Sequence, residues 1–249
     1  MSNLPKVGDT FPTRYHGIVT VIEYVHSKHV VVVFQDGAQK VVANKELRNG
    51  IIKNNFHPEI YGVGYLGEGP FSSGCKGQKG SSKEYHVWTD MLKRCYDSSL
   101  HEKQPTYKGC SVSEGWLNFQ NFAAWLTKQT GFKEGWHLDK DIICTGNKIY
   151  SPSTCTLVPQ EINNLLTLRG SCRGDTPLGV TRKGRGFIAS LSHGDSSKHL
   201  GVFPTAQEAF SAYKMCKEQR IKDVVSRYRD SLTPETYLAL SNYEISIDD

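Results

Sequence analysis

The sequence lacks any apolar run of roughly 18 or more residues, so it predicts no membrane-spanning helix. Its first residues, MSNLPKVGDTF, lack the hydrophobic region of a signal peptide, and we therefore expect a cytoplasmic protein. The 7 cysteines include no CxxC pair, which favours reduced and mostly buried thiols. Structural zinc usually needs paired, closely spaced ligands, so a zinc ion on Cys95, Cys110 and Cys155 is the less favoured alternative.

The formal net charge of +5 is unevenly distributed along the 249 residues. Residues 169–229 contain 12 Lys and Arg against 5 Asp and Glu, whereas residues 230–249 contain 5 acidic residues and no Lys or Arg. Residues 57–168 are balanced, with 11 of each sign. A concentrated basic segment favours a polyanionic partner such as nucleic acid, because neutralising phosphates releases counterions. The alternative is a solvated basic face without a partner.

Residues 1–56 have the pattern of a small β-barrel. β-Branched runs at 18–22 and 30–34 are bounded by turn residues, and residues 40–42 supply a third strand. The second run is continuous, which predicts either burial on both faces or a tightly wrapped strand. Seven glycines then fall within residues 62–82, so we expect residues 57–82 to form a flexible linker.

Three later segments have helical patterns. Residues 83–97 follow a capping-box spacing from Ser81 to Glu84, and residues 233–244 begin with Thr233 as N-cap. In residues 114–129 the apolar side chains recur at the spacing of one buried helix face. We expect that face to be core and not a stacking surface; it consists of Trp116, Phe119, Phe122 and Leu126.

The stretch 137–164, HLDKDIICTGNKIYSPSTCTLVPQEINN, contains the strongest candidate site. It predicts a strand over 138–142, a tight loop, a second strand over 155–158 and a helix that opens with Pro159. Its YSPxxC and QxxNN elements resemble the HNH (ββα-metal) endonuclease motif of phage homing-type enzymes. That resemblance implies one divalent metal, Mg²⁺ or Mn²⁺, held by Asp139 and by Asn163 or its neighbour Asn164.

Lys140 stands where the HNH family has its catalytic His. An unperturbed Lys pKa of about 10.4 makes Lys140 a poor base, although it can hold a phosphate. On an extended strand His137, Asp139 and Asp141 share one face and Lys140 points away, so His137 is an alternative base. The Asn that braces the loop in the family aligns with Thr154, and Asn147 is the alternative brace.

Residues 176–229 resemble the APETALA-type (ethylene-response-factor-like) DNA-binding domain, in three strands and one helix. The matching residues are LGVTRKGRGFIASL and HLGVFPTAQEAFSAY, with strands expected at 178–182, 187–191 and 198–203 and Thr205 as helix cap. The family places its sheet in the major groove of DNA. The resemblance implies five outward DNA contacts: Arg182, Lys183, Arg185, Lys198 and His199. Phe187 replaces the usual Trp of the family.

The sequence therefore predicts an α+β fold in five segments. These are a small β-barrel (1–56), a Gly-rich linker (57–82), an HNH-like nuclease domain (83–168), an APETALA-like domain (169–229) and a C-terminal helix with an acidic tail (230–249). The leading hypothesis is a monomeric phage endonuclease that binds double-stranded DNA and hydrolyses its phosphodiester bonds. The alternatives are a catalytically inactive DNA-binding regulator and a protein–protein interaction module.

Overall fold

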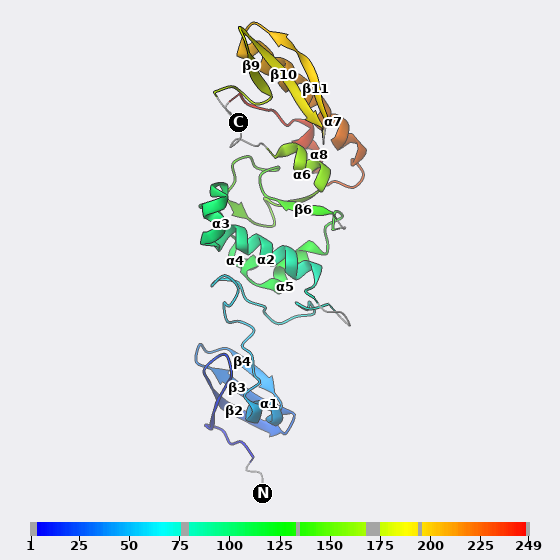
Figure 1. The fold of residues 1–249 in the computed structure, drawn as a ribbon. Helices are drawn as coiled ribbons and strands as arrows, with labels where there is room; N and C mark the ends of the chain where they lie inside the picture. Colours follow the sequence, from blue (N-terminus) through cyan, green and yellow to red (C-terminus); the bar gives the residue numbers. More distant parts are fainter. Residues whose placement is uncertain (1–3, 76–79, 133–134, 168–174, 194–195, 248–249) are drawn as a thin grey trace. The chain divides into compact units, whose positions relative to one another are not determined.

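The computed structural model describes residues 4–75, 80–132, 135–167, 175–193 and 196–247. The fold mixes helices and strands, in line with the predicted α+β class, and it forms two compact units, Met1–Trp125 and Leu126–Asp249 (Figure 1). The predicted nuclease segment, 83–168, contributes residues to both units. Within the described ranges, every helix is too short or too polar to cross a membrane.

The first unit begins with an antiparallel sheet in the order β1-β2-β3-β4, followed by helix α1 (Asn44–Asn49). The strands are β1 (Thr10–Pro12), β2 (Ile18–His26), β3 (His29–Phe34) and β4 (Gln39–Val42). One face of this sheet packs with Leu47 of α1 and Ile52, which are 1% and 2% exposed.

The predicted barrel is wrong, because this sheet is open. β1 and β4 occupy opposite edges and are not paired with each other in the part of the chain that the structure describes. They have only three and four residues, whereas a barrel needs tilted, staggered strands that pair around the full circle. Burial on both faces is also wrong, since residues along β3 alternate between half-buried and buried.

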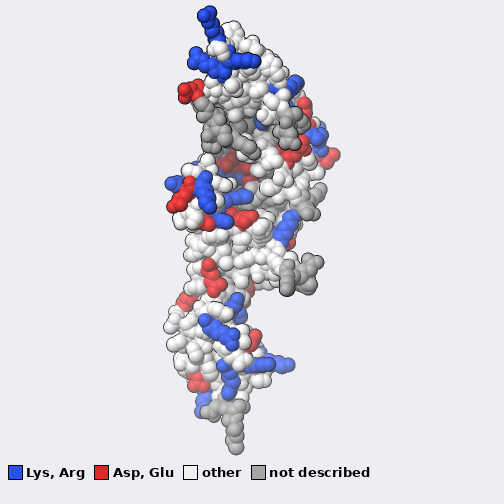
Figure 2. Space-filling model, in the orientation of Figure 1, with Lys and Arg blue, Asp and Glu red and all other residues white. Residues whose placement is uncertain are grey.

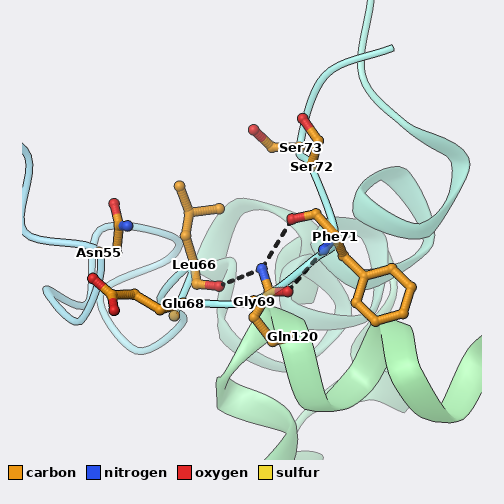
Figure 3. Close-up of a pocket in the computed structure, with 9 residues that line it drawn as sticks. Asn55, Leu66, Glu68, Gly69, Phe71, Ser72, Ser73 and Gln120 are labelled. Carbon is orange, nitrogen blue, oxygen red and sulfur yellow. Dashed lines mark hydrogen bonds between the residues drawn. The ribbon is translucent and has the colours of Figure 1, made fainter. Parts of the chain in front are cut away.

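The glycine-rich segment is folded against helix α5 (Phe119–Leu126) and is not a free tether over residues 60–73. The Gln120 amide nitrogen donates to the carbonyls of Leu66 (3.2 Å) and Phe71 (2.9 Å), and its oxygen accepts the Phe71 N–H at 3.0 Å (Figure 3). A Cβ at Gly69 would clash with the Gln120 side chain, so the absence of a side chain permits this close approach.

Short helices and aromatic side chains complete the first unit. The elements are α2 (Lys83–Tyr96), α3 (Ser98–Lys103), the 3₁₀ turn η1 (Pro105–Tyr107), β5 (Ser111–Val112), α4 (Glu114–Leu117) and α5. The N-cap of α2 is Ser82, whose hydroxyl accepts the Tyr85 N–H, and not the expected Ser81. Trp88, buried completely, donates its indole N–H to the Trp116 carbonyl at 2.7 Å.

The single helix predicted over 114–129 is divided at Asn118, which is extended. Tyr65 explains the break: its N–H donates to the Leu117 carbonyl, and its own carbonyl accepts the Phe119 N–H, both at 2.9 Å. The aromatic face is nevertheless core as predicted, since Trp116, Phe119 and Phe122 are 2%, 0% and 0% exposed.

The second unit combines a ββα element with a three-stranded sheet. β6 (Trp136–Asp139) pairs antiparallel with β8 (Thr156–Pro159), and α6 (Gln160–Leu166) follows; β7 (Ile149–Tyr150) lies in the connection. The sheet has the order β11-β10-β9, with β9 (Val180–Lys183), β10 (Gly186–His193) and β11 (Ser196–Phe203). Helices α7 (Ala206–Arg227) and α8 (Pro234–Ser241) complete it.

One hydrophobic core joins these parts. It contains Val158 and Ile162 of the ββα element, Ala189 of the sheet, Phe210 of α7 and Leu240 of α8. At the surface, an ion pair also links two of these parts, since Arg227 of α7 lies 2.6 Å from Glu161 of α6. The ββα element and the sheet therefore fold as one body, although the sequence suggested two separate modules.

Candidate functional site

The candidate site begins where β6 ends, at Asp139. The Oδ1 atom of Asp139 accepts the N–H groups of Asp141 (2.8 Å) and Ile142 (3.0 Å). These bonds turn the chain away from the sheet, as Asp side chains do at turns. The predicted strand through residue 142 is thus too long, and Asp141 does not share a strand face with Asp139. Both bonds use Oδ1, which leaves Oδ2 for a ligand.

Asp139 faces a cavity of about 160 Å³ together with Asn163 of α6. The cavity draws its walls from the loop after β6, from α6 and from the C-terminal segment: Asp139, Asp141, Ile142, Thr145, Asn163, Leu166, Thr167 and Tyr243. The structure therefore brings three of the predicted site residues together, namely Asp139, Asp141 and Asn163.

Three predicted site residues do not line this cavity, namely His137, Lys140 and Asn164. Asn164, the neighbour of Asn163, is exposed on α6 and is absent from the cavity walls. His137 is half-buried and pairs with Val158, while Asp139 pairs with Thr156 in the same register. Because alternate residues of a strand share a face, His137 and Asp139 point to the same side of β6.

The electrostatic setting of Asp139 opposes its ionisation. Burial raises the pKa of the Asp139 carboxyl, and the neighbouring Asp141 carboxylate raises it further. The two backbone N–H bonds and the charge of Lys140 lower this pKa without cancelling the effect of burial. A cation in the cavity would favour the ionised form, so the site has a carboxylate that gains from a positive ligand.

The Lys140 side chain makes its hydrogen bonds within the loop that follows β6. Its ammonium group lies 2.7 and 2.8 Å from the two carboxylate oxygens of Asp141 and 2.6 Å from the Asn147 carbonyl oxygen. It also lies 5.9 Å from the centroid of the Tyr150 ring. Lys140 is 6% exposed, so this arrangement places it as a structural cation and not as a base facing the cavity.

Asn147 braces the same loop. Its amide nitrogen donates to the carbonyls of Lys140 (3.0 Å) and Ile149 (2.7 Å), and its amide oxygen accepts the Ile149 N–H at 3.0 Å. Thr154 contributes a hydroxyl bond to the Ile149 carbonyl at 2.8 Å. Both candidates proposed from the sequence therefore support the loop, with Asn147 making the larger share of its bonds.

Among the residues that the structure describes, neither the cysteines nor a cluster of metal ligands forms a second site. Cys95, Cys110 and Cys155 are buried, and burial raises the pKa of the Cys155 thiol to about 12, which disfavours a nucleophilic thiolate. Cys172 lies outside the described residues. Within those residues, no three His, Cys, Asp or Glu side chains gather in a group suited to a metal. The pair of Asp139 and Asn163 is not such a group, because it has two residues and one of them is an Asn.

Strand alternation divides the five predicted DNA-contacting residues between the two faces of the C-terminal sheet. Lys183 pairs with Gly186 and His199 pairs with Ser190, on the face that points away from α7. Arg185 lies in the exposed turn between β9 and β10. Figure 2 shows Lys and Arg side chains gathered at one end of this sheet.

Strand alternation places Arg182 and Lys198 on the other face of the sheet, although both residues are exposed, so their contact with DNA stays a prediction. Arg182 pairs with Phe187, whose ring packs against the core, and the guanidinium carbon lies 5.9 Å from that ring. Lys198 pairs with the buried Leu191 and borders a groove of about 880 Å³ between β11 and α7. Successive residues of a strand point to opposite faces, so Arg182 and Lys183 do not share one.

The sequence did not reveal five of the cavity residues: Ile142, Thr145, Leu166, Thr167 and Tyr243. Tyr243 follows α8 and is close in sequence to Ile245, which is 1% exposed and donates its N–H to the Glu218 carboxylate at 2.9 Å. The acidic tail therefore packs against the fold at Ile245 and again at Ile247, which is partly buried against the same core. The sequence signal for this packing was Ile245, an apolar residue in the acidic C-terminal segment.

No protein-family model, curated protein or solved structure matches this chain. The candidate function therefore depends on the geometry of the chain itself.

Proposed function

We propose that this chain is a metal-dependent DNA endonuclease of the HNH type, which nicks or cuts double-stranded DNA. The observation that carries the proposal is the meeting of Asp139, at the end of β6, and Asn163, on α6, in the walls of one cavity. A strand carboxylate opposite a helix amide on a ββα element is the arrangement that such chemistry requires.

The donor set fits a hard divalent cation. Asp139 offers a carboxylate oxygen and Asn163 an amide oxygen, and Mg²⁺ prefers oxygen ligands, commonly one or two carboxylates beside water and phosphate. When bound, the ion would neutralise the charge that develops on the scissile phosphate and its leaving oxygen. Asp139 and Asn163 would orient that phosphate in the cavity, and Asp141 would add negative charge at its edge.

His137 is the residue we assign as general base. It shares a face of β6 with Asp139, and neutral imidazole accepts a proton near neutral pH. Lys140 is excluded from that role in our proposal, since its ammonium group is bonded to Asp141 and to the Asn147 carbonyl. DNA would be held by the basic turn between β9 and β10 and by Lys183 and His199.

Supercoiled-plasmid cleavage with Mg²⁺ or Mn²⁺ tests the proposal. The wild-type protein should nick the plasmid, and Asp139→Ala and Asn163→Ala should each abolish nicking. Asn164→Ala is the matched control, because Asn164 is an exposed neighbour outside the cavity walls, and it should retain activity. His137→Ala should lower the rate by about 10²–10⁴-fold if His137 is the base. Wild-type protein without nicking in either metal would overturn the proposal.

The second candidate is a DNA-binding protein without nuclease activity. One observation favours it. Lys140 aligns with the catalytic His of the HNH family, but its ammonium group binds Asp141 and the Asn147 carbonyl within the loop. A gel shift with duplex DNA, in the absence of cleavage by wild-type protein, would select this function. Loss of both binding and cleavage would leave the protein–protein module.

A further inference from the structure

The face of the C-terminal sheet that points away from α7, which we call the open face, carries a mixed set of side chains. Among the residues that strand alternation and register place on it are Thr181, Lys183, Ile188, Ser190, His199 and Val202, together with Gly186, Ser192 and Ser197. The opposite face carries Val180, Ala189 and Leu191, all buried beneath α7 in the core. The open face therefore has no role in packing the described core.

Two apolar side chains lie side by side on the open face. Ile188 of β10 and Val202 of β11 are direct cross-strand partners, and such partners have neighbouring Cβ atoms. Val202 is 63% exposed, and neither residue belongs to the core that the other face forms with α7. Ile188 also pairs with Thr181 of β9, so a polar residue borders the apolar pair.

The charges around this pair favour DNA as its occupant. Lys183 and His199 share the open face, Arg185 lies at the adjacent turn, and none of the residues named on the open face is acidic. A protein interface usually covers about 800 Å² on each partner and has an apolar centre, which two side chains do not provide. The major groove of DNA is wide enough for strands.

We propose that Ile188 and Val202 recognise the 5-methyl groups of thymine in the major groove, so that the sheet selects sites containing A·T pairs. The thymine methyl is the apolar group on the major-groove edges of the four standard bases, and apolar side chains are its usual contacts. Lys183 and Arg185 hold the phosphates beside it. This inference rests on the DNA binding in the proposed function, and it is independent of whether the cavity cleaves.

Deoxyuridine, which lacks this methyl group, provides the test. Preferred duplexes are selected from a random-sequence pool with the full-length protein and then remade with deoxyuridine in place of thymidine. The selected duplexes should be enriched in A·T pairs, and wild-type protein should bind the thymidine form about fourfold more tightly for each methyl group it buries. The Ile188→Ala/Val202→Ala variant should bind both forms equally.

Two control variants separate this effect from general weakening. Lys183→Ala should weaken binding to both forms by the same factor, because a phosphate contact carries no base information. Met215→Ala changes an exposed apolar residue of α7, which is 74% exposed and outside the open face, and it should keep the thymidine preference.

Each outcome decides between the two proposals. Equal wild-type affinity for both forms would overturn methyl recognition while leaving DNA binding intact. A thymidine preference that persists in the Ile188→Ala/Val202→Ala variant would also overturn it, because other residues would then contact the methyl groups. Binding to neither form would overturn the proposed function and methyl recognition with it. Circular dichroism of each variant shows whether the fold is retained.

Discussion

Lys140 clamps Asp141 in the loop after β6, with its ammonium nitrogen 2.7 and 2.8 Å from the two carboxylate oxygens. The same nitrogen donates to the Asn147 carbonyl, so one buried cation fixes both sides of the loop that borders the cavity. These contacts give Lys140 a structural place in the loop, whatever its part in the proposed chemistry.

Replacing Lys140 by Met should lower the free energy of unfolding by about 1–3 kcal/mol, because charge-assisted bonds to Asp141 and Asn147 are lost and the carbonyl is left without this donor. Urea unfolding followed by tryptophan fluorescence measures the change. Lys222→Met, at an exposed position of α7, is the control and should change the value by less than about 0.5 kcal/mol. If Lys140→Met keeps the wild-type stability but loses all cleavage, Lys140 instead takes part directly in the cleavage reaction.

Asp139→Asn should abolish cleavage and make the protein more stable at neutral pH. Burial raises the pKa of Asp139 in the folded state, so the folded state loses stability as the pH rises above the ordinary Asp pKa of about 3.9. Asn has no charge to bury, and its amide oxygen can still accept the N–H groups of Asp141 and Ile142. The difference in free energy of unfolding between Asp139→Asn and the wild type should therefore increase with pH up to the raised pKa of Asp139. Above that pH the difference should stay constant.

Thermal unfolding of wild-type protein and Asp139→Asn across the pH range checks this sign. Mg²⁺ or Mn²⁺ should raise the wild-type midpoint and leave that of the variant unchanged, because binding to the folded state stabilises it. A variant that is less stable at every pH would show that the Asp139 carboxylate is needed for folding.

Thr236→Val should destabilise the second unit by about 1–3 kcal/mol, since it leaves the buried Thr156 hydroxyl without its partner. The two hydroxyl oxygens are 2.6 Å apart, and Thr236 is completely buried. The double variant Thr156→Val/Thr236→Val should recover part of this loss, because both polar groups are then removed together. Urea unfolding of the wild type, the two single variants and the double variant gives the coupling energy between the two hydroxyl groups. If the destabilisations of the two single variants simply add in the double variant, the predicted hydrogen bond is contradicted.

Arg185→Ala and Lys183→Ala should each reduce the salt dependence of DNA binding by about 1 unit in the slope of log affinity against log salt. Fluorescence anisotropy at several salt concentrations measures that slope. Lys222→Ala, on α7, is the comparison that should keep the wild-type slope. Equal slopes in all four proteins would place the phosphate contacts elsewhere on the chain.

Local sequence signals predicted much of the second unit. Thr205 and Thr233 cap α7 and α8 as expected, because a Thr hydroxyl at the N-cap satisfies a free backbone N–H. The three strands of the sheet begin or end within a few residues of their predicted limits. The β6–β8 pair and α6 also follow the expected ββα order.

Contacts between distant residues account for most of the differences. Asp139 turns the chain through its own side chain and so ends β6 early. Gln120 binds the glycine-rich segment from about 50 residues away, which no local pattern encodes. Tyr243 lines the cavity from the segment after α8, in which Ile245 is buried. The opposite faces of Arg182 and Lys183, by contrast, follow from strand alternation and were open to prediction.

The shared core of the second unit has a geometric consequence. Val158 and Ile162 of the ββα element and Ala189 of the sheet are packed into one close-fitting interior, so the cavity and the open face keep a constant separation. DNA held on the open face would present the same phosphate to Asp139 each time. The second unit would then cut the DNA strand at one fixed distance from the bases that it recognises. The strand breaks would not be spread over several positions.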